Sequence, residues 1–262
     1  MTTRNRSTTD SAFRKAAWFW LALALWMILA SGVSVARGAE SGQAEPEEQE
    51  ALETDPWESF NARMFRFNHQ VLDRYFLKPV AKAWDFVLPD PVQRSLRNAV
   101  DNTNFMSRLV NSLAQGKFVG AGRELARVSI NTTIGLGGLF DVAGAGFGIE
   151  ESDEDTGQTL GFYGVDPGPY LVLPLLPPMN VRDGLGGIVD RAMNPINYLI
   201  PFVANADAGT TFGALMGITL TDAINQRSLN LETFEGIEQA VIDLYSAVRD
   251  GYQQKRESKI RE

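Results

Sequence analysis

The sequence predicts an all-α domain, and three observations support this prediction. Apolar residues recur at spacings of three and four, which places them on one face of a helix. Asp-Pro pairs at positions 55–56 and 90–91 are typical of helix starts. Alternating strand patterns with hairpin turns are nearly absent. A chain of 262 residues, 44% of them hydrophobic, is long enough to bury a core.

The first 54 residues are expected to lie outside the helical domain. Basic residues at positions 4–15 precede a charge-free run from Ala16 to Ala36, which is typical of an export signal. We expect residues 1–39 to be cleaved, although this run of 21 residues is also long enough for a retained membrane anchor. In both cases the remainder lies outside the cytoplasm. Residues 40–54 contain six Glu and no base, which predicts an extended, disordered acidic linker.

The helical domain is predicted to span residues 55–250. Asp55 can cap the first helix, Pro56 suits its first turn, and Pro79 should end it. A second helix should begin at Asp90. Further helices are predicted at 104–115, 118–134, 181–193, 205–227 and 231–253. Residues 251–262 should form a charged, solvated tail.

Two apolar segments without a clear helical pattern interrupt these helices. The first, Thr132–Gly148, is rich in Gly, and the second, Gly157–Asp183, is rich in Pro and aliphatic residues. Five acids between them, in the range 150–155, predict a solvated loop. Because prolines fix the backbone of the second segment, its unpaired carbonyls should face a polar opening.

Composition excludes several classes of function. The formal charge is −8, or −12 without residues 1–39, and no basic cluster follows that segment, which argues against nucleic-acid binding. The chain has no Cys, so disulfides, thiolate catalysis and thiolate metal sites are excluded, and no Cys is present for lipid acylation. The Gly-rich segment lacks the Gly-Lys-Ser/Thr ending of a phosphate-binding loop.

No catalytic group is predicted. His69 is the only histidine and has no nucleophile motif beside it, so we interpret it as structural. The carboxylates Glu150, Glu151, Asp153, Glu154 and Asp155 match neither a glycosidase pair nor an EF-hand. No metal site and no cofactor are expected. Isolated charges beside apolar segments are either paired to orient loops or in contact with a polar head group, and both roles remain open for Asp141, Arg182, Asp183 and Asp190.

A broad aromatic helix and two apolar segments leave more apolar surface than a monomer in water normally exposes. Such surfaces mark contacts with a membrane or a partner. Transfer of about 400 Å² of apolar surface into lipid gains about 10 kcal/mol, which would hold a protein at a bilayer.

Four stretches then resemble the MlaA family, also called VacJ. They are "DPWESFNARMFRFNHQVLDRYFLKPVAKAW", "NTTIGLGGLFDVA", "TLGFYGVDPGPYLVLPLLPP" and "VRDGLGG", which occur in the family's order over about residues 55–200. The chain departs from the family in one respect, since most members are lipoproteins and this sequence has no Cys.

The resemblance implies a fold and a function. Family members look like an all-helical ring (a doughnut) in the inner leaflet of the bacterial outer membrane, with an amphipathic channel. They remove phospholipid misplaced in the outer leaflet and pass it to a periplasmic carrier, MlaC, without a cofactor, and some associate with trimeric porins. We therefore expect a phospholipid conduit on the periplasmic face of the outer membrane. A structural or adhesive envelope protein, or an envelope hydrolase, is the alternative.

Site residues follow as a hypothesis. The channel hairpin would contain Gly135, Gly137, Gly138, Leu139, Phe140 and Asp141. The membrane-facing or rim positions would be Trp57, Phe60, Phe67, Tyr163, Tyr170, Leu171, Leu173 and Leu175. Arg182 and Asp183 would orient the loops.

Overall fold

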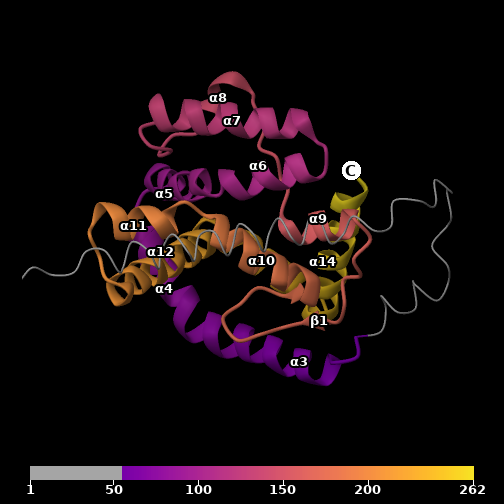
Figure 1. Cartoon of the computed structure of the whole chain (residues 1–262). Helices are drawn as coiled ribbons and strands as arrows, with labels where there is room; N and C mark the ends of the chain where they lie inside the picture. The colour runs from indigo at the N-terminus through magenta and orange to yellow at the C-terminus, as the bar shows by residue number, and fades with distance from the viewer. Residues whose placement is uncertain (1–54) are drawn as a thin grey trace, which may run out of the picture. The chain divides into compact units, whose positions relative to one another are not determined.

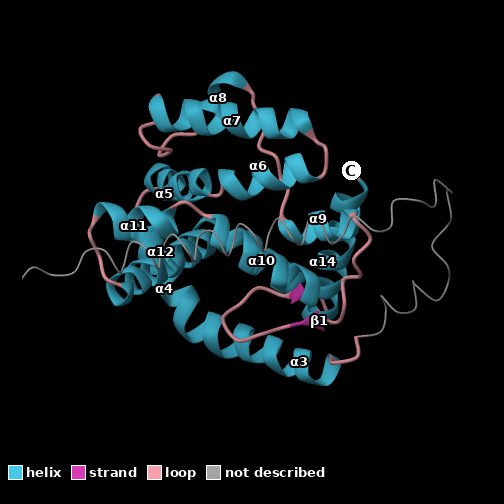
Figure 2. Cartoon of the chain, in the orientation of Figure 1, coloured by secondary structure: helices cyan, strands magenta, loops and turns pink. Residues whose placement is uncertain are grey.

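Helices build most of the described chain, and the only strands among residues 55–262 form one short pair, which confirms the all-α prediction (Figures 1 and 2). The structure is a computed structural model that describes residues 55–262, so the predictions for 1–39 and 40–54 lie outside the described residues. The elements are α3 (Glu58–Arg66), the π-helix η1 (Phe67–Leu77), α4 (Lys78–Val87), α5 (Asp90–Thr103), α6 (Phe105–Ala114), α7 (Phe118–Thr133), α8 (Val142–Phe147), α9 (Thr156–Phe162), β1 (Tyr170–Leu171), β2 (Met179–Asn180), α10 (Val181–Met193), α11 (Ile196–Val203), α12 (Ala208–Leu229), α13 (Leu231–Ala240) and α14 (Leu244–Arg261).

The predicted helix end at Pro79 is wrong. Helices α3, η1 and α4 follow one another without a break from Glu58 to Val87. Within a regular α-helix, the ring of Pro79 would clash with the carbonyl four residues earlier. Here the wider π turns come directly before it, and Lys78 donates its N–H to the carbonyl of Asp73, five residues back. The π geometry therefore carries the helix through the proline.

The predicted helix at 231–253 is also wrong as one element. It divides into α13 and α14, and Asp243 caps α14 by accepting hydrogen bonds from the N–H groups of Tyr245 and Ser246. In addition, α14 continues to Arg261, so residues 251–262 are not a solvated tail. Arg256 and Lys259 form ion pairs with the acidic segment before α9, which holds this end of the helix in place.

The predicted starts of the other helices are confirmed for α5, α6, α7, α10 and α12 to within three residues. Short helices α8, α9 and α11 were not predicted. The first two begin at Asp side chains that accept a backbone N–H: Asp141 from Gly144, and Asp155 from Gln158. Both caps lie in segments whose Gly content or charge obscures a helical pattern.

The helices form layers in which segments distant in sequence meet. Figure 1 shows α7 and α8 above α5 and α6, while α4 and α12 run below them. The strands β1 and β2 pair antiparallel, with Tyr170 opposite Asn180, at the start of α10. This pairing brings the Pro-rich segment back against α3 and α14 (Figure 2).

The distribution of polar and apolar residues is the reverse of that in ordinary globular proteins. Among the described residues, the buried apolar side chains are few and mostly small: Ala81, Ala121, Ala143, Tyr170, Val172 and Tyr245. Buried polar or charged residues are nearly three times as numerous, and they include Glu124 and Gln93, both fully buried. Large apolar side chains such as Phe86 (93% exposed) and Phe202 (86%) point outward instead. Internal cohesion therefore depends on hydrogen bonds and ion pairs.

Candidate functional site

A large polar cavity lies among the helices. Its volume is about 1110 Å³, and helices α5, α6, α7, α8, α12 and α13 all contribute side chains to its lining. This arrangement fits the ring-like domain that the resemblance implies. Ten carboxylates and four guanidiniums line the cavity, an excess of six negative charges when all are ionised. These are Asp85, Asp90, Asp101, Glu124, Asp141, Glu150, Glu151, Asp153, Asp222 and Glu232, with Arg94, Arg97, Arg108 and Arg127.

A buried ion pair supports one wall of this cavity. Arg108 on α6 donates to Glu124 on α7 over 2.8 Å and to Asp101 on α5 over 2.9 Å. Glu124 is fully buried, and its second oxygen accepts the backbone N–H of Ser152 at 2.6 Å. Burial alone would lower the pKa of Arg108, but Asp101 and Glu124 outweigh it and raise this pKa. The contacts of Arg108 and Glu124 therefore join α5, α6 and α7 to the segment that contains Ser152, and the guanidinium of Arg108 stays ionised.

The Gly-rich hairpin between α7 and α8 meets the cavity at Asp141. Asp141 accepts hydrogen bonds from Asn131 (2.9 Å) and from the N–H of Gly144 (3.0 Å), and it lies 3.2 Å from Arg127. Burial raises its pKa, but these donors outweigh burial, so the pKa is lowered and the carboxylate is ionised at neutral pH. Asp141 therefore joins the hairpin to α7.

The other predicted hairpin residues do not line the cavity. Gly138 has a φ of +93°, and a Cβ there would lie 2.6 Å from the side chain of Asn102, so only glycine fits. A Cβ on Gly135 would lie 2.2 Å from the carbonyl oxygen of Phe140. Gly137 has a φ of +74° and open space around it. Leu139 and Phe140 are 37% and 52% exposed, on the outside of the hairpin. Glycine thus allows the hairpin to turn tightly against α5 and α7.

The predicted membrane-facing residues divide into exposed and buried positions. Trp57, Phe60, Phe67 and Tyr163 are exposed, as is Leu175, whereas Leu171 and Leu173 are half-buried. The prediction is wrong for Tyr170, which is only 4% exposed. Its ring packs against the rings of Tyr245 and Tyr252, in a small cluster that also contains Val172.

Two asparagines hold the Pro-rich segment against the first helix. Asn61 donates to the carbonyl of Tyr170 at 2.8 Å and accepts the N–H of Val172 at 2.9 Å. Seven residues later, Asn68 donates to the carbonyl of Leu173 at 2.8 Å and accepts the N–H of Leu175 at 3.2 Å. The sequence predicts that carbonyls of this segment are unpaired and face a polar opening. This prediction is wrong for the carbonyls of Tyr170 and Leu173, which accept hydrogen bonds from the two asparagines.

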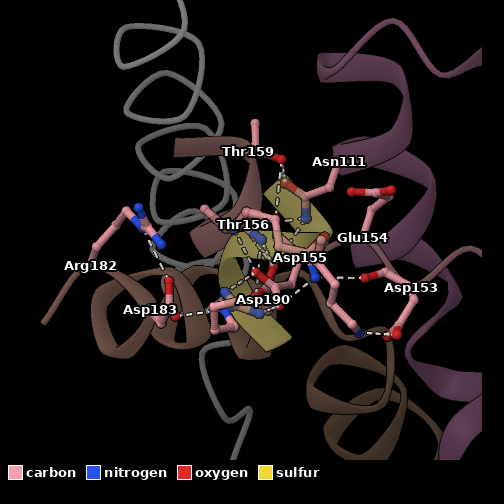
Figure 3. Close-up of polar contacts among 12 residues, drawn as sticks. Asn111, Asp153, Glu154, Asp155, Thr156, Thr159, Arg182, Asp183 and Asp190 are labelled. Atoms are coloured by element: carbon pink, nitrogen blue, oxygen red, sulfur yellow. Dashed lines mark hydrogen bonds and ion pairs between the residues drawn. The ribbon is translucent and has the colours of Figure 1, made fainter. Parts of the chain in front are cut away.

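Arg182 and Asp183 lie in a charge network that joins α9, α10 and α14 (Figure 3). Arg182 donates to the carbonyl of Val165 at 3.0 Å and to Asp183 at 3.1 Å. Arg256 on α14 contacts Asp183 at 2.6 Å and donates to Asp155 at 2.9 Å. These contacts are the ones expected if Arg182 and Asp183 orient the Pro-rich segment.

The acidic segment is a loop, as the sequence predicts, and Glu150, Glu151 and Asp153 are exposed in it, whereas Glu154 and Asp155 are half-buried. Asp155 pairs with Arg256, Glu154 with Lys117 at 2.8 Å, and Asp153 with Lys259. Figure 3 shows these three acids beside one another, among the polar contacts around α9. The bases that pair with Glu154 and Asp155 come from positions distant in sequence, so the local run of acids could not show that these two residues are partly buried.

Asp190 on α10 differs from the other carboxylates because neutral groups surround it. It accepts the hydroxyls of Ser107 and Thr156, both at 2.6 Å, and the amide of Asn111 at 3.2 Å (Figure 3). No ion pair of Asp190 occurs among residues 55–262. Burial raises its pKa, and the donated hydrogen bonds only partly offset that effect.

His69 lies on η1, its ring stacked on Phe65, with its Nε2 atom 3.8 Å from Glu238. The ligand atoms of His69, Asp73 and Glu238 lie within 4.8 Å of one another, close enough to hold a metal ion. Arg227 already binds both oxygens of Asp73, at 2.7 and 3.0 Å, and Lys78 lies 3.9 Å from Glu238. Neighbouring cations thus neutralise both carboxylates, and these residues do not fit a metal well.

These features define an all-helical, membrane-associated protein with a charged cavity inside an apolar exterior. Within residues 55–262, no helix has both the length and the apolar character needed to cross a membrane. The sequence model of the MlaA lipoprotein family matches residues 53–259. The chain belongs to this family.

Individual relatives agree with this assignment. The chain is 34% identical over 210 residues to the "Intermembrane phospholipid transport system lipoprotein MlaA" of Haemophilus influenzae, covering 79% of each protein. It is 32% identical to the Escherichia coli protein of the same name, over 78% of this chain and 77% of the relative. A solved structure reported as the "Structural basis for maintenance of bacterial outer membrane lipid asymmetry" matches with a TM-score of 0.69 and 32% identity, over 79% of this chain and 99% of the other.

Proposed function

We propose that this protein is a non-catalytic component of intermembrane phospholipid transport that preserves the lipid asymmetry of the bacterial outer membrane. One observation carries the proposal: the helices turn their large apolar side chains outward and enclose a charged cavity. A phospholipid has both a polar head and apolar tails, so its transfer needs a polar path within a body that sits in lipid. Relatives named for phospholipid transport support the same conclusion.

The apolar exterior supplies the contact with the membrane. Phe86, Phe202 and Phe212 are 93%, 86% and 65% exposed, and full burial of one such side chain in lipid gains about 1.5–3 kcal/mol. Several of them together hold the protein at a bilayer without an acyl group. We place it on the periplasmic face of the outer membrane, where misplaced phospholipid enters the polar cavity.

The proposed partners are a soluble periplasmic lipid carrier of the MlaC type and, for some members, a trimeric porin. The carrier takes phospholipid from the cavity and needs no cofactor on this protein. The hairpin Gly135–Asp141 borders the path through Asp141, while Leu139 and Phe140 lie exposed on its outside. A photo-crosslinker at Leu139 or Phe140 should then capture phospholipid in cells.

The test is lipid transfer by the full chain in proteoliposomes that contain a labelled phospholipid. Labelled lipid should move to the soluble carrier and should also co-purify with the protein in mass spectrometry. Absence of both would favour a structural or adhesive envelope protein. Release of fatty acid or lysophospholipid that is abolished by His69→Ala would show a hydrolase instead. In our proposal, His69→Ala leaves the rate of lipid transfer unchanged.

A further inference from the structure

A second cavity lies between α5 and α12, and its lining is almost entirely apolar. Its volume is about 360 Å³, within the range of about 300–1,000 Å³ that is usual for small-molecule sites. Leu96, Ala99 and Val100 line it from α5, and Ala214, Gly217 and Ile218 line it from α12. Such a lining suits a hydrocarbon chain.

This apolar groove adjoins the polar cavity. Val100 and Asp222 line both, so the two spaces are neighbours where α5 and α12 face each other. The groove alone would accept any apolar group. Its junction with a charged cavity restricts the ligand to an amphipathic molecule.

Three polar groups in the lining of the polar cavity are available to such a ligand. Within residues 55–262, neither Arg97 on α5 nor Asp222 on α12 forms an ion pair. Burial raises the pKa of Asp222, while the nearby charge of Arg97 acts in the opposite direction. The hydroxyl of Ser228, also in the lining, is 4% exposed as a residue and has no hydrogen-bond partner among the described residues. A buried hydroxyl without a partner indicates that a polar group is missing from its surroundings.

We propose that the two cavities together form one seat for a single phospholipid, with an acyl chain in the α5–α12 groove and the head group in the polar cavity between Arg97 and Asp222. The proposal rests on the proposed function and names the kind of phospholipid it involves. Arg97 matches the phosphate, and Asp222 matches an ammonium group. The ligand is therefore a zwitterionic phospholipid such as phosphatidylethanolamine, and the six excess negative charges of the cavity oppose a head group with net negative charge.

Two glycines on α12 allow a matched test. A Cβ on Gly217 meets no other atom within 4 Å, so a larger side chain there would fill the groove without a clash. The same is true of Gly213, one turn earlier, which does not line the groove. Leu has a better helix propensity than Gly at both positions. Gly217→Leu should therefore block the groove, and Gly213→Leu is its control.

The experiment uses the full chain in nanodiscs that contain phosphatidylethanolamine with a diazirine midway along one acyl chain. After photolysis, mass spectrometry should find cross-links on α5 and α12 in the wild type and in Gly213→Leu. Gly217→Leu should lower this labelling about tenfold, as expected when about two methylene groups lose their apolar surroundings. Equal labelling of Gly217→Leu and Gly213→Leu would contradict the proposal that an acyl chain binds in the α5–α12 groove.

A second variant tests whether head group and chain share one seat. Arg97→Gln should also reduce groove labelling, because the two parts belong to one molecule, and unchanged labelling would contradict the joint seat. The transfer assay separates this proposal from the function. If the wild type transfers lipid but Gly217→Leu leaves the groove labelling unchanged, no acyl chain occupies the groove, and the proposed transport function is unaffected. If the wild type neither transfers nor co-purifies with lipid, the function itself fails.

Discussion

The lining of the polar cavity and the outward faces of the same helices differ in what holds each in place. Two buried charged side chains in the lining, Arg108 and Glu124, have fixed partners on neighbouring helices. Outward residues, such as Phe86 and Phe202, touch little protein. Substitution of such a buried, paired residue should therefore lower folding stability, whereas substitution on the exterior should change membrane attachment. The following predictions test this division.

The largest effect is expected at the buried ion pair. Arg108→Ala leaves the fully buried Glu124 without its cation, which should cost about 3–5 kcal/mol in the free energy of unfolding. Urea titration of the protein in mild detergent measures it. Arg94→Ala is the control, since Arg94 and Asp90 are 67% and 60% exposed and their pair should contribute less than about 1 kcal/mol. Equal losses for the two variants would contradict a polar interior that stabilises the fold.

The asparagine contacts should rank by burial. Asn61→Ala removes the partners of Tyr170 and Val172 at a fully buried site, and we expect a loss of about 2–3 kcal/mol. Asn68 is only partly buried, so Asn68→Ala should cost about 1 kcal/mol. Hydrogen exchange of the Val172 and Leu175 amides would report which contact has been lost. The reverse order would show that the segment is held elsewhere.

Membrane attachment should respond to the exterior alone. Phe86→Ser should weaken liposome partitioning by about tenfold or more, since an exposed Phe gains about 1.5–3 kcal/mol in lipid. Its unfolding free energy should hardly change. Val172→Ala, at a fully buried site, should do the opposite and lose about 2 kcal/mol of stability while partitioning stays constant. Co-sedimentation with liposomes measures the partitioning, and urea titration measures the stability. A loss of stability in Phe86→Ser or weaker partitioning of Val172→Ala would contradict the prediction.

The smallest effects concern pH and have opposite signs within one network. The folded pKa of Asp190 is raised from 3.8, so its contribution to stability is present below that pH and is lost as pH rises through the folded pKa. The folded pKa of Asp155 is lowered from 3.8 because Arg256 outweighs burial, so its contribution is present above that pH and is lost on acidification. Relative to wild type, Asp190→Asn should therefore gain stability as pH rises, and Asp155→Asn should lose it. Unfolding free energies of wild type and variants, measured from well below pH 3.8 to neutral pH, test both signs: the Asp155→Asn curve should approach that of wild type on acidification, and the Asp190→Asn curve should rise relative to wild type above pH 3.8. A curve parallel to wild type would contradict the sign for that residue.

The sequence predicts helix positions well where local patterns decide them. Helix α5 begins at the predicted Asp90-Pro91 pair, and α7 and α10 begin at the predicted residues 118 and 181. The helix through Pro79 could not be predicted, because the π geometry before it depends on packing rather than on propensity. The break before α14 was missed because Val241 and Ile242 continue an apolar pattern that the backbone does not follow.

Site residues could be predicted where they form turns or helix caps, but not where they make long-range contacts. The glycines at 135–138 and the cap at Asp141 stand out in sequence. Asn61 and Asn68 belong to the family pattern, yet nothing nearby shows that they bind backbone more than 100 residues away. Tyr170 has the composition of a lipid-facing residue, and only the positions of Tyr245 and Tyr252 bury it.

The scarcity of large buried apolar side chains also determines how this fold responds to temperature. Hydration of apolar groups raises the heat capacity on unfolding, and hydration of polar groups lowers it. An interior made of Glu124, Gln93, Asn61 and similar residues exposes mainly polar surface. The heat-capacity increment should therefore fall below the usual value of about 12–15 cal/mol/K per residue. A small increment flattens the stability curve, so the fold loses little stability when the cell cools.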